Sequence, residues 1–202
     1  MPEGPELRVI CDNLNFILIN KDITNIDILS GRYYDVEKRP HNYIEFINNL
    51  PLKIKKIDVK GKLLYFIFEN DWIILNTMGM SGRWTNNYEK HCHIEIKFNN
   101  KSIWFCDPRR FGTIKFIKGI NLLNKKLMTL GPDLLNSNIQ FEDFYKILMK
   151  HSNKNVTKVL MNQSIVSGCG NYIKSESLYR SGISPHNIIK NINKESLEKL
   201  FI

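Results

Sequence analysis

The chain has 202 residues, enough for one large domain or two small ones, each with its own hydrophobic core. Hydrophobic residues make up 43% and charged residues 24%, as in globular proteins, and no apolar run approaches the roughly 18 residues of a membrane span. The formal net charge of +9 favours a polyanionic partner, because Lys and Arg displace counterions from phosphates. Residues 2–17 lack the basic start and the cleavage site of a secretion signal. We therefore expect an intracellular protein, in nucleus or cytoplasm, and a viral source stays open.

The first 120 residues predict one helix followed by a sheet. Residues 4–19 have apolar side chains at helical spacing, and Pro5 suits a first helical turn. Six short segments then alternate with Gly, Asn and Asp, and they are rich in Ile, Phe, Trp and Tyr. They are residues 54–60, 62–69, 72–78, 92–98, 102–107 and 112–117. The pattern predicts an antiparallel β-sandwich.

The remainder of the chain predicts helices only. After Gly131-Pro132-Asp133, helical spacing covers residues 140–151, 157–161, 173–181 and 194–202. The expected fold class is α+β with two domains. Residues 1–120 form the first domain, with an N-terminal helix and a β-sandwich, and residues 131–202 form an all-α domain.

The four cysteines contain no Cys-x-x-Cys pair. Cys11, Cys92, Cys106 and Cys169 are therefore predicted to be reduced thiols that form neither a disulfide nor a zinc site. On a strand, the side chains of His91 and His93 share one face and Cys92 points to the other, so these three form no local metal cluster.

The amino terminus reads Met-Pro-Glu-Gly-Pro-Glu and contains a candidate nucleophile. Removal of Met1 would expose the secondary amine of Pro2, and an α-amine titrates near pH 8. Such an amine can form a cationic iminium with C1′ of a deoxyribose. Glu3 is then placed to protonate the sugar ring oxygen as a general acid. The alternative is a terminus without a function, followed by a helix whose first turn accepts Pro and Glu.

Four further motifs follow in a fixed order. They are Lys60-Gly61-Lys62-Leu63-Leu64, Met78-Gly79-Met80-Ser81-Gly82, Asp107-Pro108-Arg109-Arg110-Phe111-Gly112, and Gly168-Cys169-Gly170-Asn171-Tyr172 running into Ser175-Glu176-Ser177-Leu178-Tyr179-Arg180. With the opening, they resemble the Fpg/Nei family of base-excision DNA glycosylases/AP lyases over essentially the whole chain. The opening is most similar to the Nei-like (endonuclease VIII-like) branch. The resemblance implies a helix-two-turn-helix fold for residues 131–202.

The resemblance implies four catalytic residues. Pro2 is the nucleophile that forms the Schiff base, and Glu3 assists opening of the sugar ring. Glu6 supports the site. Lys62 binds the phosphates that flank the lesion and assists elimination, although a solvated lysine at a strand edge is the alternative reading.

The resemblance also implies three side chains that fill the gap left by an extruded nucleotide. A flexible apolar side chain such as Met80 can wedge into a base stack, although Met78 could exchange roles with it. Arg109 faces the orphaned base and Phe111 inserts beside it. Extrusion costs a few kcal/mol of stacking, so some substitute for the base is required.

Three more residues are expected to contact DNA. His91 matches a DNA-contacting position of the family, and a strand histidine with a local hydrogen bond is an equal account. Lys154 matches a phosphate contact, with Lys150 and Lys158 as alternatives. Asn171 opens a helix at a tight glycine turn, where it would donate to a phosphate or serve as a plain N-cap.

The expected function is excision of oxidised bases, with β,δ-elimination after formation of the Schiff base. The Nei-like opening favours oxidised pyrimidines and hydantoins, whereas Asp107–Gly112 is shared with purine-acting relatives. The expected partner is damaged double-stranded DNA, with single-stranded DNA as a further substrate, and the expected state is a monomer. Family members continue into a hairpin finger, zinc-bound in many. These 202 residues do not contain it, so neither zinc nor any cofactor is expected.

Two other classes of protein stay open. A non-catalytic binder of damaged or abasic DNA would keep the basic surface together with Met80, Arg109 and Phe111 but would not need the amine. An RNA-binding protein would explain the positive charge and not the amino terminus.

Overall fold

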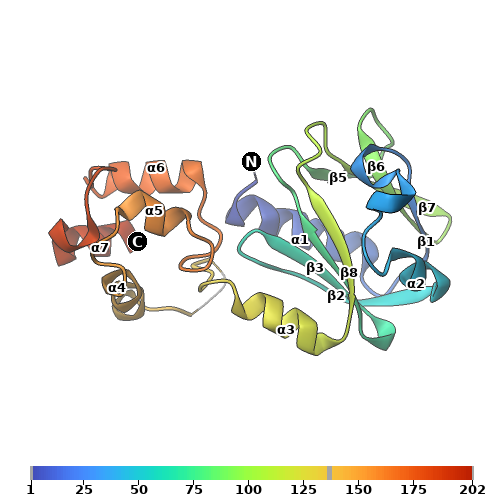
Figure 1. The fold of residues 1–202 in the computed structure, drawn as a ribbon, viewed down its shortest axis with the longest axis horizontal. Helices are drawn as coiled ribbons and strands as arrows, with labels where there is room; N and C mark the ends of the chain where they lie inside the picture. The colour runs from blue at the N-terminus through green and yellow to red at the C-terminus, as the bar shows by residue number, and fades with distance from the viewer. Residues whose placement is uncertain (1, 136–137, 202) are drawn as a thin grey trace. The chain divides into compact units, whose positions relative to one another are not determined.

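The computed structural model describes residues 2–135 and 138–201, which divide into two compact units at residues 127 and 128 (Figure 1). The first unit contains α1 (Gly4–Leu18), β1 (Asp22–Ile28), α2 (Tyr43–Asn48), β2 (Leu52–Lys60), β3 (Leu63–Phe68), β4 (Trp72–Thr77), β5 (Arg83–Thr85), β6 (Cys92–Phe98), β7 (Lys101–Cys106), β8 (Thr113–Lys118) and most of α3 (Ile120–Met128). The second contains α4 (Phe141–Met149), α5 (Val156–Met161), α6 (Asn171–Arg180) and α7 (Lys194–Phe201). Short 3₁₀ turns complete both units: Gly31–Tyr33, Val36–Lys38, Glu69–Asp71 and Ile189–Asn191.

The strands of the first unit form one antiparallel sheet in the order β5-β7-β6-β1-β2-β3-β4-β8. Only two register pairs join β1 to β2, so the sheet divides there into two halves. The halves face one another. Trp84 of β5 lies 5.8 Å from Phe66 of β3, ring centroid to ring centroid, and its indole N–H donates to Asn76 Oδ1 of β4 at 3.0 Å. The predicted antiparallel β-sandwich is confirmed.

Helix α1 packs against β2 and runs antiparallel to it. Its buried residues, Leu7, Cys11, Leu14 and Leu18, recur at helical spacing. Three hydrogen bonds fix its direction along the strand: Asn20 N to Ile54 O at 3.0 Å, Asn15 Nδ2 to Ile57 O at 2.8 Å, and Arg8 Nη2 to Asp58 Oδ1 at 2.9 Å. Along this contact the residue numbers of α1 fall as those of β2 rise, so the start of α1 lies toward the turn between β2 and β3.

The strand register gathers the two long motif loops at one end of the sandwich. In one half, Leu64 pairs with Asn76 and Thr77 pairs with Thr113, so β3 starts where β4 ends and β8 starts. In the other half, Cys106 pairs with both Arg83 and Cys92, so β7 ends where β5 and β6 start. Residues 78–82 connect β4 to β5, and residues 107–112 connect β7 to β8. Both loops therefore cross between the halves at the same end.

Several elements differ from the sequence expectation. β1, β5, α2 and α3 were not predicted. β1 is rich in polar residues and β5 has only three residues, so neither gives a clear strand pattern. His91 does not lie on a strand. It occupies the turn before β6 with φ of +71°, so the alternation assumed for residues 91–93 was wrong.

The second unit is helical, as predicted for the chain after residue 131. Its core is formed by side chains from α4 to α7, including Phe144, Leu148, Val159, Leu178 and Leu197. The rings of Phe144 and Phe201 lie 5.3 Å apart and close α7 against α4. The N-cap of α5 is Asn155, whose Oδ1 accepts from the backbone N–H groups of Thr157 and Lys158.

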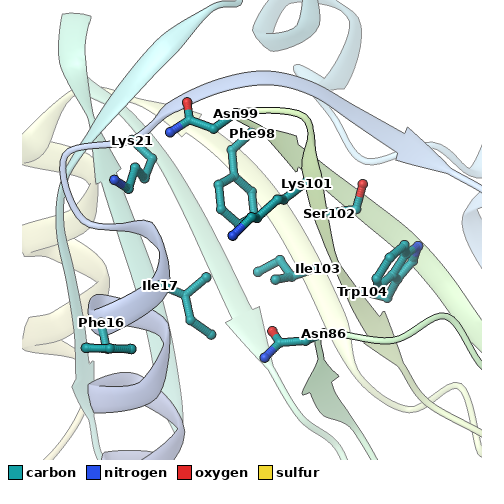
Figure 2. Close-up of a pocket in the computed structure, with 10 residues that line it drawn as sticks. All are labelled: Phe16, Ile17, Lys21, Asn86, Phe98, Asn99, Lys101, Ser102, Ile103 and Trp104. Atoms are coloured by element: carbon teal, nitrogen blue, oxygen red, sulfur yellow. The ribbon is translucent and has the colours of Figure 1, made fainter.

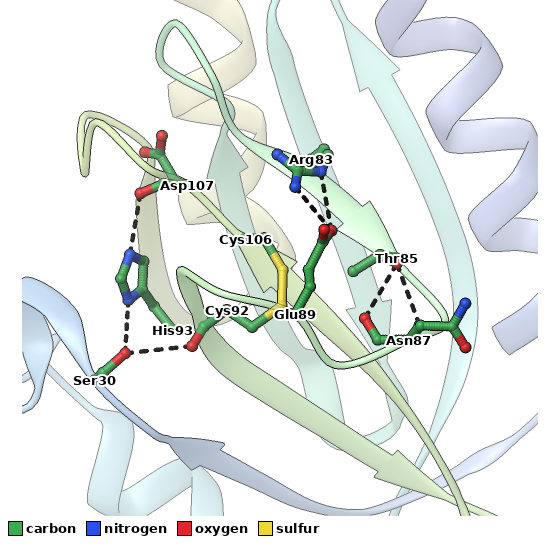
Figure 3. Close-up of a disulfide and its surroundings, with 9 residues drawn as sticks. All are labelled: Ser30, Arg83, Thr85, Asn87, Glu89, Cys92, His93, Cys106 and Asp107. Atoms are coloured by element: carbon green, nitrogen blue, oxygen red, sulfur yellow. Dashed lines mark hydrogen bonds and ion pairs between the residues drawn. A yellow bond between two sulfur atoms is a disulfide. The ribbon is translucent and has the colours of Figure 1, made fainter.

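The prediction of four reduced thiols was wrong for two of them. Cys92 and Cys106 form a disulfide between β6 and β7 (Figure 3), whereas Cys11 and Cys169 are free and buried. The sequence contains no Cys-x-x-Cys signal because the two cysteines are 14 residues apart. The strand register places them opposite each other.

Reduction of this disulfide should destabilise the first unit. A cross-link that closes a loop of this length contributes about 3 kcal/mol through the entropy of the unfolded chain. We expect thermal unfolding of the oxidised protein to shift to lower temperature in a thiol reductant. A Cys92→Ala/Cys106→Ala variant should show no such shift. Four titratable thiols in unreduced, unfolded protein would contradict the prediction.

Candidate active site

The amino terminus is held by the first turn of α1. Pro2 is half-buried, and Glu3 is the N-cap of the helix with only 2% of its surface exposed. Glu6 reaches back so that its Oε2 accepts from the Glu3 N–H at 3.1 Å, as part of a capping box. Glu6 therefore acts on the helix turn, and the buried Glu3 is the residue next to the candidate nucleophile in the chain.

Lys62 lies in the turn between β2 and β3 and is half-buried. Since α1 runs antiparallel to β2, this turn and the start of α1 are at the same end of the unit. Lys60 on the other side of Gly61 has a structural contact, because its Nζ donates to Leu127 O at 2.9 Å. The fold thus brings Pro2, Glu3 and Lys62 to one end of the sandwich.

The loops 78–82 and 107–112 contact each other backbone to backbone. Gly79 has φ of +59°, and a Cβ there would lie 2.6 Å from both Gly112 N and Phe111 C. Only glycine fits this approach without displacement. Met80 is 44% exposed, whereas Met78 is 2% exposed and part of the core. This difference assigns the surface position to Met80.

Arg109 and Phe111 lie together at the surface. Phe111 is 55% exposed, and the Arg109 guanidinium carbon lies 5.2 Å from the centroid of its ring. This distance is within the range of a cation–π contact. Met80, Arg109 and Phe111 therefore project from two loops that touch, as gap-filling side chains must.

Asp107 is the residue of this site that the sequence reasoning missed. Its side chain is 1% exposed, and its carboxylate accepts from Ser81 Oγ at 2.5 Å, from Gly112 N at 2.6 Å and from Arg109 N at 3.3 Å. It thereby links the two loops. An Asp before Pro with Gly five residues on is typical of a turn held by the aspartate side chain, and this signal could have identified it.

The two histidines beside the disulfide have different surroundings. His91 is half-buried in its turn, and its ring centroid lies 6.4 Å from that of His93. His93 is 8% exposed and lies between Ser30 and Asp107 (Figure 3). Burial lowers the pKa of His93 below its ordinary value, and the nearby Arg110 acts in the same direction.

In the second unit, Asn171 is the first residue of α6 and its side chain is exposed. The N-cap is Gly170, so the plain N-cap reading of Asn171 was wrong. Asn171 Oδ1 accepts from Lys174 Nζ at 3.1 Å. The preceding turn is held by Gln163, which was not predicted. Its Oε1 accepts from Gly168 N at 3.0 Å, and its Nε2 donates to Cys169 O at 2.8 Å.

The basic stretch of the second unit does not single out one lysine. Lys154, Lys150 and Lys158 are all exposed. Lys154 lies in the turn before α5, and its carbonyl accepts from Ile189 N. Glu176 pairs with Arg180 at 2.7 Å, one turn further along α6.

The first unit also contains a group of potential metal ligands and an open hollow, and neither includes the predicted catalytic residues. Among the described residues, one group of three potential metal ligands was found, Glu89 with Cys92 and Cys106. The sulfurs are joined and Glu89 pairs with Arg83 at 2.8 Å, so these groups are engaged elsewhere (Figure 3). An open hollow of about 560 Å³ lies between α1 and β7. It is lined by residues such as Phe16, Ile103 and Lys101, and none of the described residues that line it carries a carboxylate (Figure 2).

Comparison with known proteins identifies the family. Residues 1–114 match the formamidopyrimidine-DNA glycosylase N-terminal domain, and residues 130–201 match its H2TH domain. The formamidopyrimidine-DNA glycosylase of Ligilactobacillus salivarius is 33% identical over 99% of this chain and 73% of that protein. The protein of the same name from Ureaplasma parvum is 32% identical over 99% of this chain and 74% of its own.

Solved structures have the same fold. MutM in complex with DNA containing carbocyclic 8-oxo-G is 25% identical, with a TM-score of 0.85 over 99% of this chain and 76% of that one. MutM (Fpg) from Thermus thermophilus is 23% identical, with a TM-score of 0.81 over 99% and 72%, and shows the fold alone.

The two units and their relatives define a DNA-binding glycosylase of base excision repair. The chain belongs to the formamidopyrimidine-DNA glycosylase family, with a sandwich domain followed by an H2TH domain. The relatives indicate the Fpg branch in place of the Nei-like branch that the opening residues favoured. In the described part of the chain, no helix combines the length and the apolar character that crossing a membrane requires.

Substitution of Gly79 by alanine should test whether the close contact between the two loops matters for stability and for DNA binding. We expect Gly79→Ala to lower the free energy of unfolding by more than about 1 kcal/mol and to weaken binding to abasic-site duplex, because the new Cβ meets the 107–112 backbone. Gly182→Ala is the matched control, since Gly182 has φ of +67° with no atom near its Cβ position. Equal losses in both variants, measured by denaturant unfolding and fluorescence anisotropy, would refute the packing argument.

Proposed function

We propose that this chain is a bifunctional glycosylase/AP lyase that uses the amine of Pro2 as its nucleophile. The observation that carries the proposal is the convergence at one end of the sandwich. The start of α1 with the buried Glu3, the turn with Lys62, and the paired loops 78–82 and 107–112 all lie there. Nucleophile, acid, phosphate contact and gap-filling side chains are needed within reach of a single nucleotide.

The proposed chemistry starts after removal of Met1, which lies outside the described residues. The Pro2 nitrogen attacks C1′ as the damaged base leaves with the glycosidic electron pair. Glu3 protonates the ring oxygen, the sugar opens, and a cationic iminium joins Pro2 to C1′. The iminium acidifies C2′, so a proton is lost there and the 3′ phosphate leaves. A second elimination releases the 5′ phosphate and leaves a one-nucleotide gap.

The other predicted residues act on DNA in this proposal. Lys62 holds the phosphates that flank the lesion, and Glu6 keeps the first turn of α1 in place through its bond to the Glu3 N–H. Met80, Arg109 and Phe111 replace the extruded nucleotide. His91 in the first unit, and Lys154 and Asn171 in the second, contact the backbone of the duplex.

The preferred lesion follows from the branch of the family. The expectation of oxidised pyrimidines rested on the Nei-like opening, which the relatives do not support. The relatives are named for formamidopyrimidine, and one structural neighbour was solved on 8-oxo-G DNA. We therefore propose ring-opened and 8-oxidised purines in duplex DNA as the main substrates.

The proposed chemistry is complete in protein side chains and one backbone amine. The proposed reaction needs neither a metal nor a cofactor bound by these residues, because the iminium itself acts as the electron sink. We propose that the protein acts as a monomer and that it works inside the cell, where its DNA substrate is.

Borohydride trapping tests the nucleophile. Incubation with an abasic-site duplex should give a covalent adduct that peptide mapping locates at residue 2. We expect Pro2→Gly to lower the yield at least about tenfold, because a primary amine forms an imine that can lose its proton and its charge, whereas the proline iminium stays cationic. Lys62→Ala, the control, should still give the adduct. Binding of the duplex without any adduct would favour the non-catalytic binder, and an adduct mapped to a lysine would refute Pro2.

A lesion panel tests the substrate class. Single-turnover excision should be measured on duplexes with formamidopyrimidine, 8-oxoguanine, thymine glycol or a hydantoin. We expect the purine lesions to be excised with kcat/KM roughly tenfold higher than thymine glycol, a ratio accessible to pocket contacts. Preference for thymine glycol would return the chain to the Nei-like expectation.

A further inference from the structure

Asp107 has a second set of contacts on the side away from Ser81. Its carbonyl accepts from Arg110 N at 3.0 Å, which closes the turn of residues 107–110. Arg110 has φ of +57°, an uncommon conformation for a residue other than glycine. Asp107 N also donates to His91 O at 3.0 Å, beside the Cys92–Cys106 disulfide. The base of the 107–112 loop is therefore fixed through the backbone as well as the carboxylate.

His93 contacts the same carbonyl from the core. Its Nε2 lies 3.0 Å from Asp107 O, and its Nδ1 lies 2.7 Å from Ser30 Oγ (Figure 3). A carbonyl oxygen only accepts, so Nε2 is the protonated nitrogen and donates to Asp107 O. Nδ1 then faces Ser30 Oγ as an acceptor, and the same hydroxyl lies 3.3 Å from Cys92 O.

The imidazole is also confined by its neighbours. Gly31 has φ of +84°, and a Cβ there would lie 2.9 Å from both Cγ and Nδ1 of His93. The chain at residues 30–31 therefore closes directly on the ring. The histidine has 8% of its surface exposed, and the backbone at residue 31 covers one side of its ring.

We propose that His93 is a positioning residue that presents Arg109 and Phe111 to DNA in one fixed geometry, with Ser30 as the hydrogen-bond partner on the other side of its ring. This inference rests on the proposed gap-filling role of the 107–112 loop. His93 acts by holding the carbonyl at which the turn begins, while Asp107 holds the rest of the loop through its carboxylate.

The consequence is a dependence on DNA structure. In duplex DNA, an extruded nucleotide leaves a gap opposite a base, and filling it requires Arg109 and Phe111 in place. In single-stranded DNA, an abasic site has no opposite base and no intact stack. A variant that only misplaces the loop should lose activity on the duplex and keep it on the single strand.

The test compares His93→Leu, which removes the donor, with His93→Gln, whose amide N–H can replace Nε2–H. We expect His93→Leu to lower borohydride trapping on abasic duplex about tenfold, the loss expected for one buried hydrogen bond, and to change trapping on the single strand less than about twofold. His93→Gln should recover most of the duplex rate. His41→Leu is the matched control, because His41 is exposed and lies outside the proposed machinery.

A second variant and a second measurement keep the test decisive. Ser30→Ala leaves the ring in place, and we expect it to lower duplex trapping about threefold with little change on the single strand. The ratio of affinities for tetrahydrofuran-containing and intact duplex should fall in His93→Leu and Ser30→Ala, even if no adduct forms with the wild type. Absence of adducts with the wild type on both DNAs would refute the proposed function. Parallel losses on both DNAs in the variants, or an unchanged affinity ratio, would overturn the role of His93.

Discussion

The buried carboxylate of Asp107 is the constraint on which the rest of the site depends. A carboxylate with 1% exposure is tolerated only when hydrogen-bond donors surround it. The donors to Asp107 come from two loops, and one of them, Ser81, is 26 residues away in the sequence. Satisfying this carboxylate brings the 78–82 and 107–112 loops together. The contact of Gly79 with the backbone at residues 111–112 follows from the same closure. Met80, Arg109 and Phe111 remain exposed on these two loops.

The topology of the sheet explains why this closure occurs beside the amino terminus. Both loops cross between the halves of the sandwich at the end where β4 and β7 stop and β5 and β8 start. The helix α1 runs antiparallel to β2, so Pro2 and Glu3 come to the end where Lys62 turns the chain. The proposed nucleophile, at a chain terminus, has little rigidity of its own. The capping box at Glu3 and Glu6 supplies rigidity, as the proposed catalysis by a positioned amine requires.

Much of the fold could be predicted from local patterns, and the failures have physical causes. Helix α1 was predicted because its apolar residues recur at helical spacing. The strands around Phe66, Ile74 and Ile96 were predicted because they are short runs rich in β-branched and aromatic residues, bounded by turn residues. β5 and the Cys92–Cys106 disulfide were not, because both depend on strand register, which pairs residues far apart in sequence. Asn171 was compatible with an N-cap by spacing, and the helix begins one residue earlier in the structure, with Gly170 as its cap.

The sequence by itself determined the chemistry available to this protein: a proline amine behind Met1, carboxylates beside it, and motif loops in the order of the formamidopyrimidine-DNA glycosylase family. The tertiary structure decided which residues hold the proposed site in position. It separated Met78 from Met80 by burial, made Asp107 the link between two loops, and placed His93 and Ser30 behind it. The physical reason is that hydrogen bonding of a buried group is settled by neighbours in space, and Ser30, His93 and Asp107 become neighbours only when the strands are paired.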